Sequence, residues 1–543
     1  MYRVIFCRGI MFTNNHSLNR NSWLIFIVGT LAFTIGLNPE FIAFETRFAL
    51  FAQEMFRHGI TFFPTTYQGP YPDYPALPTL FIYGISLLFG NVTPFSAILP
   101  TALTSAGILV LIYRLGSRFS SSMGFYGVCF ALLTQIFIDK SRTISPDQYV
   151  SFITTGIFYL AYTNQNNHSA KSLVGIPLLL VLGFALRGPI GLVIPATVLC
   201  GFYLFQQQFR RFFCFGLLSF TVLLICSGLL LAAAYHQGGY AFVKQVIDFE
   251  ALGRMTSAQA SSHFFYYWHA SLTDYALAYP VALIVMLSLI KKIARPTSDQ
   301  EKLLRDFVIW FLIIMLGMSI PGAKKARYIL PILPPIALIA AYVFIASKKF
   351  LQIIKAILIT CFYLFPLLSC FILTAGLFLL FPLYASMYSI AMIGTASLSV
   401  GSLFILFSTH SSSQKEKQIT LIAVLTLLFL NIAVLTPINY QLEKTKPFVQ
   451  AVLALQQKTP ASLVFYQIGP DAEDIKFAVN ADQSIQPLFI QNEQALWHYS
   501  KPAYFITTLD VYHSLKKNPS VILLMQGKIG HRPCVVFRLT KKT

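Results

Sequence analysis

Long apolar segments constrain this chain more strongly than any other feature of its sequence. A helix that crosses a bilayer needs roughly 20 mostly apolar residues, and segments of this kind recur along the chain. They fall at 22–38, 77–90, 96–113, 122–138, 148–163, 172–186, 189–205, 212–234, 275–290, 306–320, 328–346, 351–380, 384–408 and 418–436. Only 11% of the residues are charged, whereas soluble chains have about 25%. The sequence therefore predicts an all-α polytopic membrane protein.

The basic excess of the chain also has a membrane explanation. The formal net charge is +20, from 40 basic and 20 acidic side chains, and such an excess would otherwise suggest a nucleic-acid partner. Cytoplasmic loops of membrane proteins are enriched in Lys and Arg. Short loops of this type occur at 210–211, 291–305, 348–349 and 415–417. We expect these loops in the cytoplasm and no nucleic-acid partner.

The placement of these loops fixes the predicted topology. If residues 114–118 also lie inside, the segment 77–113 can cross the membrane only once. The short run 77–90 follows Pro75 and is therefore expected to be a half-inserted helix at the membrane edge. About thirteen transmembrane helices remain. The predicted units are a cytoplasmic tail (1–21), a transmembrane domain that begins with an uncleaved anchor (22–436, with a first outer loop at 39–95), and an outer domain (437–543).

The outer domain differs from the rest of the chain in its pattern. Short apolar runs alternate there with helical stretches, which is typical of a small α/β domain. The expected strands lie at 463–466, 503–506, 521–524 and 534–537, and the expected helices at 447–457, 493–499 and 511–517.

The first outer loop contains an amphipathic stretch at 41–57. Its apolar residues Phe44, Phe48, Phe51 and Met55 recur at helical spacing. Such a helix is expected to lie in the membrane interface and to present Glu45 or Arg47 toward the membrane surface. Ordinary solvated charges on an interfacial helix are the other interpretation of this stretch.

Three further groups of charges lie at the predicted outer ends of apolar segments, where charge is by default a hypothesis of function. Asp147 follows Ser145 and Pro146, so it could simply begin a helix. Arg187 stands alone between two apolar runs and could extend to water from a helix end. The third group has three cations in one short turn, which would also fit an inverted local topology. Its members are Lys324, Lys325 and Arg327.

Cations gathered at a membrane surface suit the phosphate of a lipid head group. A nearby carboxylate suits a general base that deprotonates an incoming hydroxyl. A membrane transferase that uses a lipid-phosphate sugar needs both kinds of group.

The order of these motifs resembles one family of enzymes. The run 45–59 and the Asp73-Tyr-Pro75 segment resemble the first outer loop of bacterial lipid-phosphate-sugar transferases. These are the 4-amino-4-deoxy-L-arabinose lipid A transferases and the relatives of dolichyl-phosphate-mannose protein mannosyltransferase (glycosyltransferase family 39, GT-C fold). Three later segments resemble the family's second acidic loop, its Gly-Pro turn and its late Arg-Tyr-x-x-Pro segment. They are 142–147, 187–189 and 325–334.

The resemblance implies an inverting transfer at the periplasmic face of the bacterial inner membrane. The acceptor hydroxyl of a lipid A or other glycolipid, a glycan or a protein attacks the anomeric carbon of the sugar. The polyprenyl phosphate, expected to be undecaprenyl phosphate, leaves. Carried over to this chain, the catalytic acids are Asp147, Glu45 and Asp73. The donor phosphate is expected to be held by Arg47, Arg187, Lys324, Lys325, Arg327 and Tyr328.

Two positions depart from the family's pattern. Phe44 stands where the family often has an acid before Glu45, and Tyr74 stands where it often has a lysine. The first departure makes Asp147 the favoured candidate for the general base. The second could be offset by Lys324 or Lys325.

Two other functions fit part of this pattern. A polyprenyl-linked sugar transporter or flippase would move the lipid without transfer, although repeated halves typical of transporters are not evident here. A GT-C ligase that uses a pyrophosphate carrier is the second alternative. Asp147 and Glu45 could hold a divalent metal, but no ligand set is spelled out, and the eight cysteines form no CxxC pair.

Overall fold

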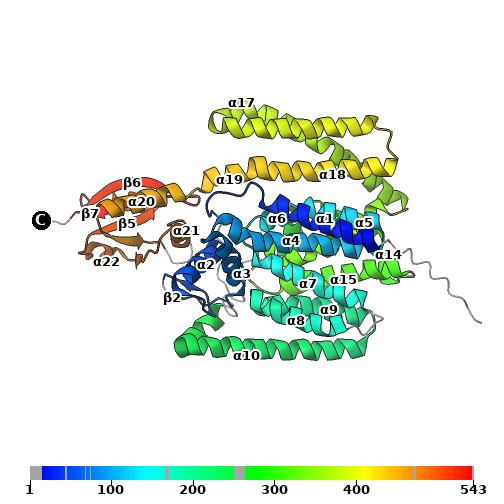
Figure 1. Cartoon of the computed structure of the whole chain (residues 1–543), viewed down its shortest axis with the longest axis horizontal. Helices are drawn as coiled ribbons and strands as arrows, with labels where there is room; N and C mark the ends of the chain where they lie inside the picture. The colour runs from blue at the N-terminus through cyan, green and yellow to red at the C-terminus, as the bar shows by residue number, and fades with distance from the viewer. Residues whose placement is uncertain are drawn as a thin grey trace, which may run out of the picture.

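The computed structural model describes residues 15–42, 46–67, 69–73, 75–164, 170–249, 263–468 and 473–540. A bundle of roughly parallel and antiparallel helices forms most of the molecule, and a small domain with a β-sheet extends from one end of it (Figure 1). The predicted fold class, a helical membrane protein with a C-terminal sheet domain, agrees with this architecture.

The bundle is built from the apolar segments of the sequence. Its helices are α1 Asn15–Thr34, α4 Pro94–Ser117, α5 Ser121–Leu132, α6 Gln135–Ser141, α7 Pro146–Thr163, α8 Ala170–Arg187, α9 Pro189–Phe205, α10 Phe209–Ile247, α12 Tyr266–Asp274, α13 Ala278–Ser288, α14 Ile290–Ala294, α15 Asp299–Ser319, η4 Ala326–Ile332, α16 Leu333–Ala341, η5 Tyr342–Phe344, α17 Lys349–Phe407, α18 Ser412–Leu430 and η6 Asn431–Leu435. Among the described residues, six helices are long and apolar enough to cross a membrane, or up to eight if each of two bent pairs counts as one span. The number thirteen stays a prediction.

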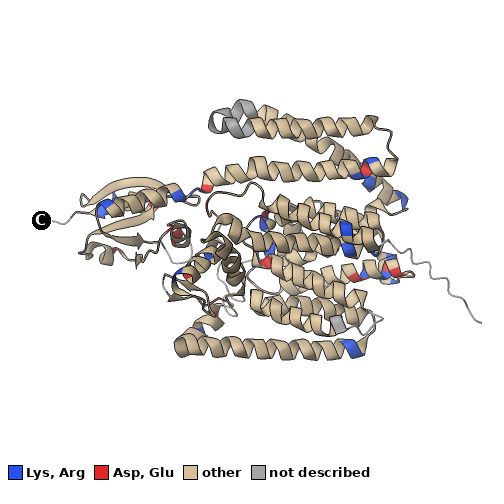
Figure 2. Ribbon diagram, viewed as in Figure 1, with Lys and Arg blue, Asp and Glu red and all other residues tan. Residues whose placement is uncertain are grey.

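The charged residues of the bundle lie mostly near its two ends, and the middle of the bundle has few of them (Figure 2). The predicted cytoplasmic loops at 291–305, 348–349 and 415–417 lie at the end remote from the sheet domain. The first outer loop lies at the other end, beside that domain. The arrangement separates the basic loops from the predicted outer segments, as the charge pattern requires.

The first outer loop contains α2 Arg47–His58, β1 Thr65–Thr66, β2 Gly69–Pro70, α3 Leu77–Ser86 and η2 Leu87–Phe89. The amphipathic helix is therefore present, but its apolar side does not face lipid. Phe48, Phe51 and Met55 are at most 3% exposed, and the two aromatic rings belong to a core shared with the C-terminal domain. Helical periodicity marks a buried face without saying whether lipid or protein covers it, and the placement of this helix in the membrane interface stays a prediction.

The C-terminal domain has a five-stranded sheet in the order β4-β3-β5-β7-β6. Strand β3 is parallel to β4 and β5, whereas β7 is antiparallel to β5 and β6. Its elements are α19 Thr436–Glu443, α20 Lys446–Lys458, β3 Ser462–Tyr466, α21 Glu473–Val479, β4 Leu488–Ile490, α22 Glu493–Trp497, β5 Ala503–Thr508, α23 Leu509–Leu515, β6 Val521–Ile529 and β7 Arg532–Leu539. The expected strands and helices all occur, and α19, α21 and β4 are additional.

Buried hydrogen bonds join this domain to the chain that leaves α1. Glu40 accepts bonds from the backbone N–H groups of Thr445 (2.9 Å) and Lys446 (2.7 Å) at the start of α20. Burial raises the pKa of the Glu40 carboxyl, and these two bonds oppose the rise. Asn480 exchanges two bonds with the backbone of Phe41. Polar contacts therefore fix the domain against the first outer loop.

Candidate active site

Asp147 lies in the first turn of α7, which begins at Pro146. The proline suits the first helical position, where no backbone N–H is required, and the acid suits the positive end of the helix dipole. Ser145 makes no side-chain cap, and its backbone N–H instead donates to Thr101 Oγ1 of α4 at 3.2 Å. The helix-start interpretation is therefore correct as local structure, but it leaves a carboxylate that is only 6% exposed and needs partners.

Arg187 supplies the first partner. It is the last residue of α8, and its Nε donates to Asp147 Oδ1 at 2.9 Å. Gly188 follows with φ 63° and ψ −153°, a backbone conformation that is essentially confined to glycine, and this turn reverses the chain into α9. The side chain is 6% exposed, so it does not reach water as a solitary arginine at a helix end would.

Arg327 supplies the second partner, from η4. Its Nε lies 3.3 Å from Asp147 Oδ2, so the two carboxylate oxygens contact two different arginines. The Tyr328 ring lies under both guanidinium groups, 5.8 Å from Cζ of Arg187 and 5.7 Å from Cζ of Arg327. Contact with the negative face of an aromatic ring favours cations. Three helices therefore meet at one carboxylate.

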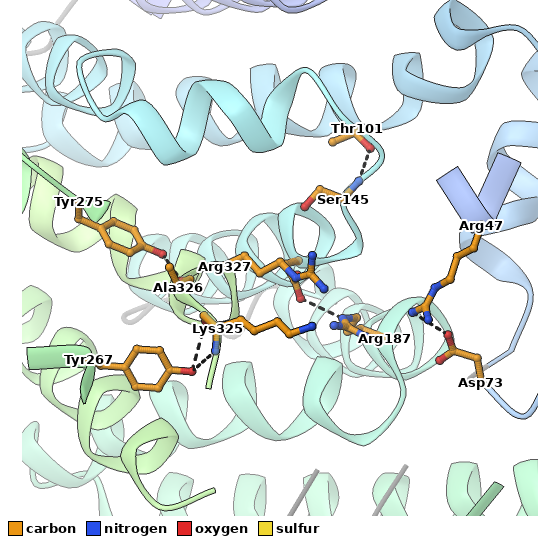
Figure 3. Close-up of polar contacts among 11 residues, drawn as sticks. Arg47, Asp73, Thr101, Ser145, Arg187, Tyr267, Tyr275, Lys325, Ala326 and Arg327 are labelled. Carbon is orange, nitrogen blue, oxygen red and sulfur yellow. Dashed lines mark hydrogen bonds and ion pairs between the residues drawn. The ribbon is translucent and has the colours of Figure 1, made fainter. Parts of the chain in front are cut away.

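Figure 3 shows the Lys325 side chain extending toward Arg187 from the turn before η4. With Lys325, three cations accompany the single carboxylate of Asp147, so the cluster has an excess of positive charge. Lys324 precedes it in the same turn and is half-buried. An anion with two negative charges would neutralise this group of side chains.

Two tyrosines that the sequence did not indicate hold the backbone of this turn (Figure 3). The Tyr267 hydroxyl lies 3.3 Å from both the backbone N and the backbone O of Lys325. The Tyr275 hydroxyl donates to the Ala326 carbonyl at 2.9 Å. Both rings are buried, at 1% and 0% exposure. The one available signal was the aromatic run at 264–268, which is equally typical of a membrane-interface segment.

Arg47 and Asp73 form a second ion pair, with 3.1 Å between Nη2 of the arginine and Oδ2 of the acid. Arg47 begins α2, and its guanidinium also lies over the rings of Phe48 and Tyr71. Asp73 precedes α3, which contacts α8, the helix that ends at Arg187. The pair therefore lies on the side of the bundle that carries the Asp147 cluster.

The structure brings most of the predicted site residues to one end of the bundle. Asp147, Arg187, Arg327 and Tyr328 are in contact, and Lys325 extends toward them. Glu45 lies outside the described residues, as do Phe44 and Tyr74.

Arg142, in the same acidic loop, has a local structural contact. It donates to the carbonyls of Ala32, Ile35 and Gly36 at 2.8–2.9 Å and so satisfies the C-terminal end of α1.

A cavity of about 470 Å³ opens beside this end of the bundle. Ile42 and Thr46, which flank the segment 43–45 in the sequence, contribute to its wall. Apolar side chains such as Leu37, Phe41 and Ile98 form part of the lining, and polar side chains from the α1–α2 connection, α6, η6 and α19 form another part. The polar ones are Asn38, Glu40, Gln135, Asp139, Arg142, Asn431, Asn439 and Glu443. Amide and carboxylate groups of this kind can hydrogen-bond a polar head group.

The described residues also indicate whether a cluster of metal-ligating side chains is present. Among them, no group of three or more His, Cys, Asp or Glu side chains lies close enough together to hold a metal ion. Asp147 has arginines on both oxygens. The suggested pair of Asp147 and Glu45 stays untested, because Glu45 lies outside the described residues.

Comparisons with known proteins agree with the expected family. Residues 73–233 match the model of the dolichyl-phosphate-mannose-protein mannosyltransferase family. The fold is similar to that of ArnT from Cupriavidus metallidurans bound to undecaprenyl phosphate, with a TM-score of 0.68 and 15% sequence identity over 96% of this chain and 97% of that one. The apo structure of ArnT gives a TM-score of 0.69 and 14% identity over 96% and 98%.

One curated relative also matches in sequence. An uncharacterized protein from Aquifex aeolicus is 26% identical over 280 residues, which are 51% of this chain and 61% of the length of that relative. The family model and the ArnT-like fold together confirm the resemblance that the sequence motifs indicated.

Proposed function

We propose that this chain, whose residues 73–233 match the model of the dolichyl-phosphate-mannose-protein mannosyltransferase family, is an inverting glycosyltransferase. It moves a sugar from a polyprenyl-phosphate carrier to a lipid, glycan or protein acceptor. The observation that carries the proposal is the buried Asp147, whose two oxygens contact Arg187 and Arg327 beside Lys325 and Tyr328. This combination provides both an anion-binding group and a carboxylate at one place.

The donor phosphate binds the cations of this cluster. The guanidinium groups of Arg187 and Arg327 present several N–H donors in a planar fork that suits phosphate oxygens. Lys325 adds a third charge, and the Tyr328 hydroxyl can donate to the same anion. Arg47, ion-paired to Asp73, and Lys324 extend the positive region. As the sugar departs, these cations stabilise the negative charge that develops on the phosphate.

Asp147 is the general base. Phosphate oxygens compete with the carboxylate for the same guanidinium N–H groups, so donor binding frees Asp147 from part of its pairing. The acceptor hydroxyl then loses its proton to Asp147 while its oxygen attacks the anomeric carbon, and the bond between that carbon and the phosphate oxygen breaks. Glu45 and Asp73 are the other acids of this reaction.

The acceptor enters through the cavity lined by Ile42 and Thr46. Its amide and carboxylate side chains face a space large enough for a polar head group. In this proposal the site and the C-terminal domain face the periplasm of a bacterial inner membrane, and the carrier is undecaprenyl phosphate. The basic loops at the opposite end of the bundle support this orientation.

An Asp147→Asn variant tests the role of the base. The amide keeps the shape of the carboxylate, so transfer should fall by about 10²- to 10⁴-fold, the usual contribution of a general base, while undecaprenyl phosphate still binds. The measurements are release of undecaprenyl phosphate from the membrane donor pool and, separately, binding of undecaprenyl phosphate to the purified protein. Unchanged turnover would remove Asp147 from the reaction.

Arg327→Gln tests the phosphate site. Loss of one charge-assisted contact should weaken binding of undecaprenyl phosphate about 10- to 100-fold. Arg295→Gln is the matched control, because Arg295 is exposed in the loop at the other end of the bundle. Equal affinity in both variants contradicts the assignment.

The same preparations separate the two rival functions. Translocation of the sugar-lipid without any transferred sugar would identify a flippase. Release of a pyrophosphate carrier would identify a ligase.

A further inference from the structure

A second cavity lies in the C-terminal domain. It is at the end of the sheet where β3, β5 and β6 begin and β7 ends, remote from the bundle. Its volume is about 700 Å³, within the range of small-molecule sites. It is lined by Thr459, Pro460, Ala461, Trp497, His498, Tyr499, Ser500, Lys501, Pro502, Ala503, Tyr504, Phe505, Asn518, Ser520, Arg538, Leu539 and Thr540. Thr540 lies three residues before the C-terminus, which Figure 1 places at the far end of the molecule.

The topology of the sheet gathers these residues. Strands β3 and β5 are parallel, and β7 runs antiparallel to β5 and β6. The starts of β3, β5 and β6 and the end of β7 therefore lie at the same end of the sheet. Ser520 and Thr540 close this end through a backbone bond of 2.8 Å. The cavity is therefore built by the strand order of the sheet.

Positive charge is one property of this cavity. Lys501 and Arg538 are exposed on its wall, and His498 lies beside them. No Asp or Glu contributes to the described lining. In the described part of the chain, neither Lys501 nor Arg538 forms an ion pair. Two cations without a carboxylate partner favour an anionic ligand.

Aromatic side chains are the second property. The Trp497 indole is half-buried at the wall, and its Nε1 donates to Glu493 Oε1 at 3.0 Å, which fixes the ring. The Tyr499 ring packs edge-to-face on Phe505, with 5.7 Å between ring centres. Its hydroxyl is buried and has no hydrogen-bond partner among the described residues. The Tyr499 ring therefore supports the wall, whereas its hydroxyl is enclosed by protein and does not reach the cavity.

We propose that this cavity binds an anionic saccharide, that is, a short glycan with carboxylate or phosphate groups. The C–H faces of a sugar ring pack against Trp497, because the face of an aromatic ring is negative and sugar C–H groups are slightly positive. Lys501 and Arg538 bind the acidic groups of the glycan. This site is separate from the Asp147 cluster and needs no transfer chemistry.

The test measures binding to the purified full-length protein in nanodiscs by isothermal titration calorimetry. The probes are trigalacturonate, glucose 6-phosphate and neutral maltotriose. We expect trigalacturonate or glucose 6-phosphate to bind at least tenfold more tightly than maltotriose, and the affinity should fall as salt rises. The two charged probes tell whether carboxylate or phosphate is preferred.

A Lys501→Gln/Arg538→Gln double variant should reduce the affinity for the preferred charged probe by at least tenfold. Lys444→Gln/Lys528→Gln is the control, because it removes the same charge from exposed positions that do not line the cavity. No binding of either charged probe, equal binding of maltotriose, or equal loss in both variants overturns the proposal. This experiment measures binding of a glycan and not transfer of a sugar. A negative result would therefore leave the proposed transferase activity unaffected, and a negative result in the transfer experiments would leave this binding site unaffected.

Discussion

At the scale of single residues, Asp147 matters because of its two neighbours. A carboxylate that contacts Arg187 and Arg327 keeps two cations close together that would otherwise repel each other. Topology and motif order could place these three residues on one face from the sequence. Their mutual contacts could not be predicted, because they depend on how α7, α8 and η4 pack, and each contact joins residues at least 40 positions apart.

The tyrosines that hold the 324–327 turn give a prediction at this scale. Tyr275→Phe removes only the hydroxyl that donates to Ala326 and leaves that carbonyl without its partner, at a cost of about 1–3 kcal/mol. The turn should loosen, so undecaprenyl phosphate should bind less tightly, with little change in the rate of transfer at saturating donor. Titration of the donor lipid measures both quantities.

The matched control is Tyr279→Phe. Its hydroxyl donates to the backbone of Trp268 and not to the turn. If both variants bind the lipid equally well, Tyr275 has no positioning role.

At the scale of elements, the α8–α9 hairpin shows how a backbone conformation aims a side chain. Gly188 adopts a positive φ between the two helices, directly after Arg187. Gly188→Ala should lower the free energy of unfolding by about 1–3 kcal/mol and displace Arg187 from Asp147. The expected result is a lower thermal midpoint together with weaker binding of undecaprenyl phosphate.

Gly216→Ala is the control for this variant. Gly216 is helical within α10 and has open space where a Cβ would lie, so alanine should be neutral or slightly stabilising there. Equal thermal midpoints for the two variants would contradict the strained turn.

Helix α2 shows where sequence patterns stop being informative. The spacing of Phe48, Phe51 and Met55 correctly indicated a helix with one apolar side. Lipid and a protein domain both accept such a face, and only the folded chain reveals that the C-terminal domain covers it. The helices and strands themselves were predictable, because periodicity and turn residues are local properties of the sequence. The elements against which they pack were not predictable from it.

At the scale of the whole molecule, the joint between the bundle and the C-terminal domain depends on Asn480. It is 2% exposed, accepts from the Phe41 N–H at 3.2 Å and donates to the Phe41 carbonyl at 2.8 Å. Asn480→Ala leaves both backbone groups unpaired and should destabilise the joint by about 1–3 kcal/mol. Faster hydrogen exchange at Phe41 and faster proteolysis near residue 41 would report this change.

Asn492→Ala serves as the comparison. Asn492 is exposed and caps α22 through the Ala495 N–H at 2.7 Å, so its loss should affect that helix alone. If exchange at Phe41 is the same in both variants, Asn480 does not hold the joint.

The contacts of Asp147 also have a consequence for biosynthesis. The ribosome synthesises Asp147, Arg187 and Arg327 in that order, and the first two are 40 positions apart. A chain that stops before residue 327 has one arginine beside the carboxylate, and a chain whose later helices insert in the wrong direction has the second on the other side of the bilayer. A nascent chain therefore acquires its polar centre only after the helices up to α15 have been synthesised and η4 has reached the same side of the bilayer as Asp147.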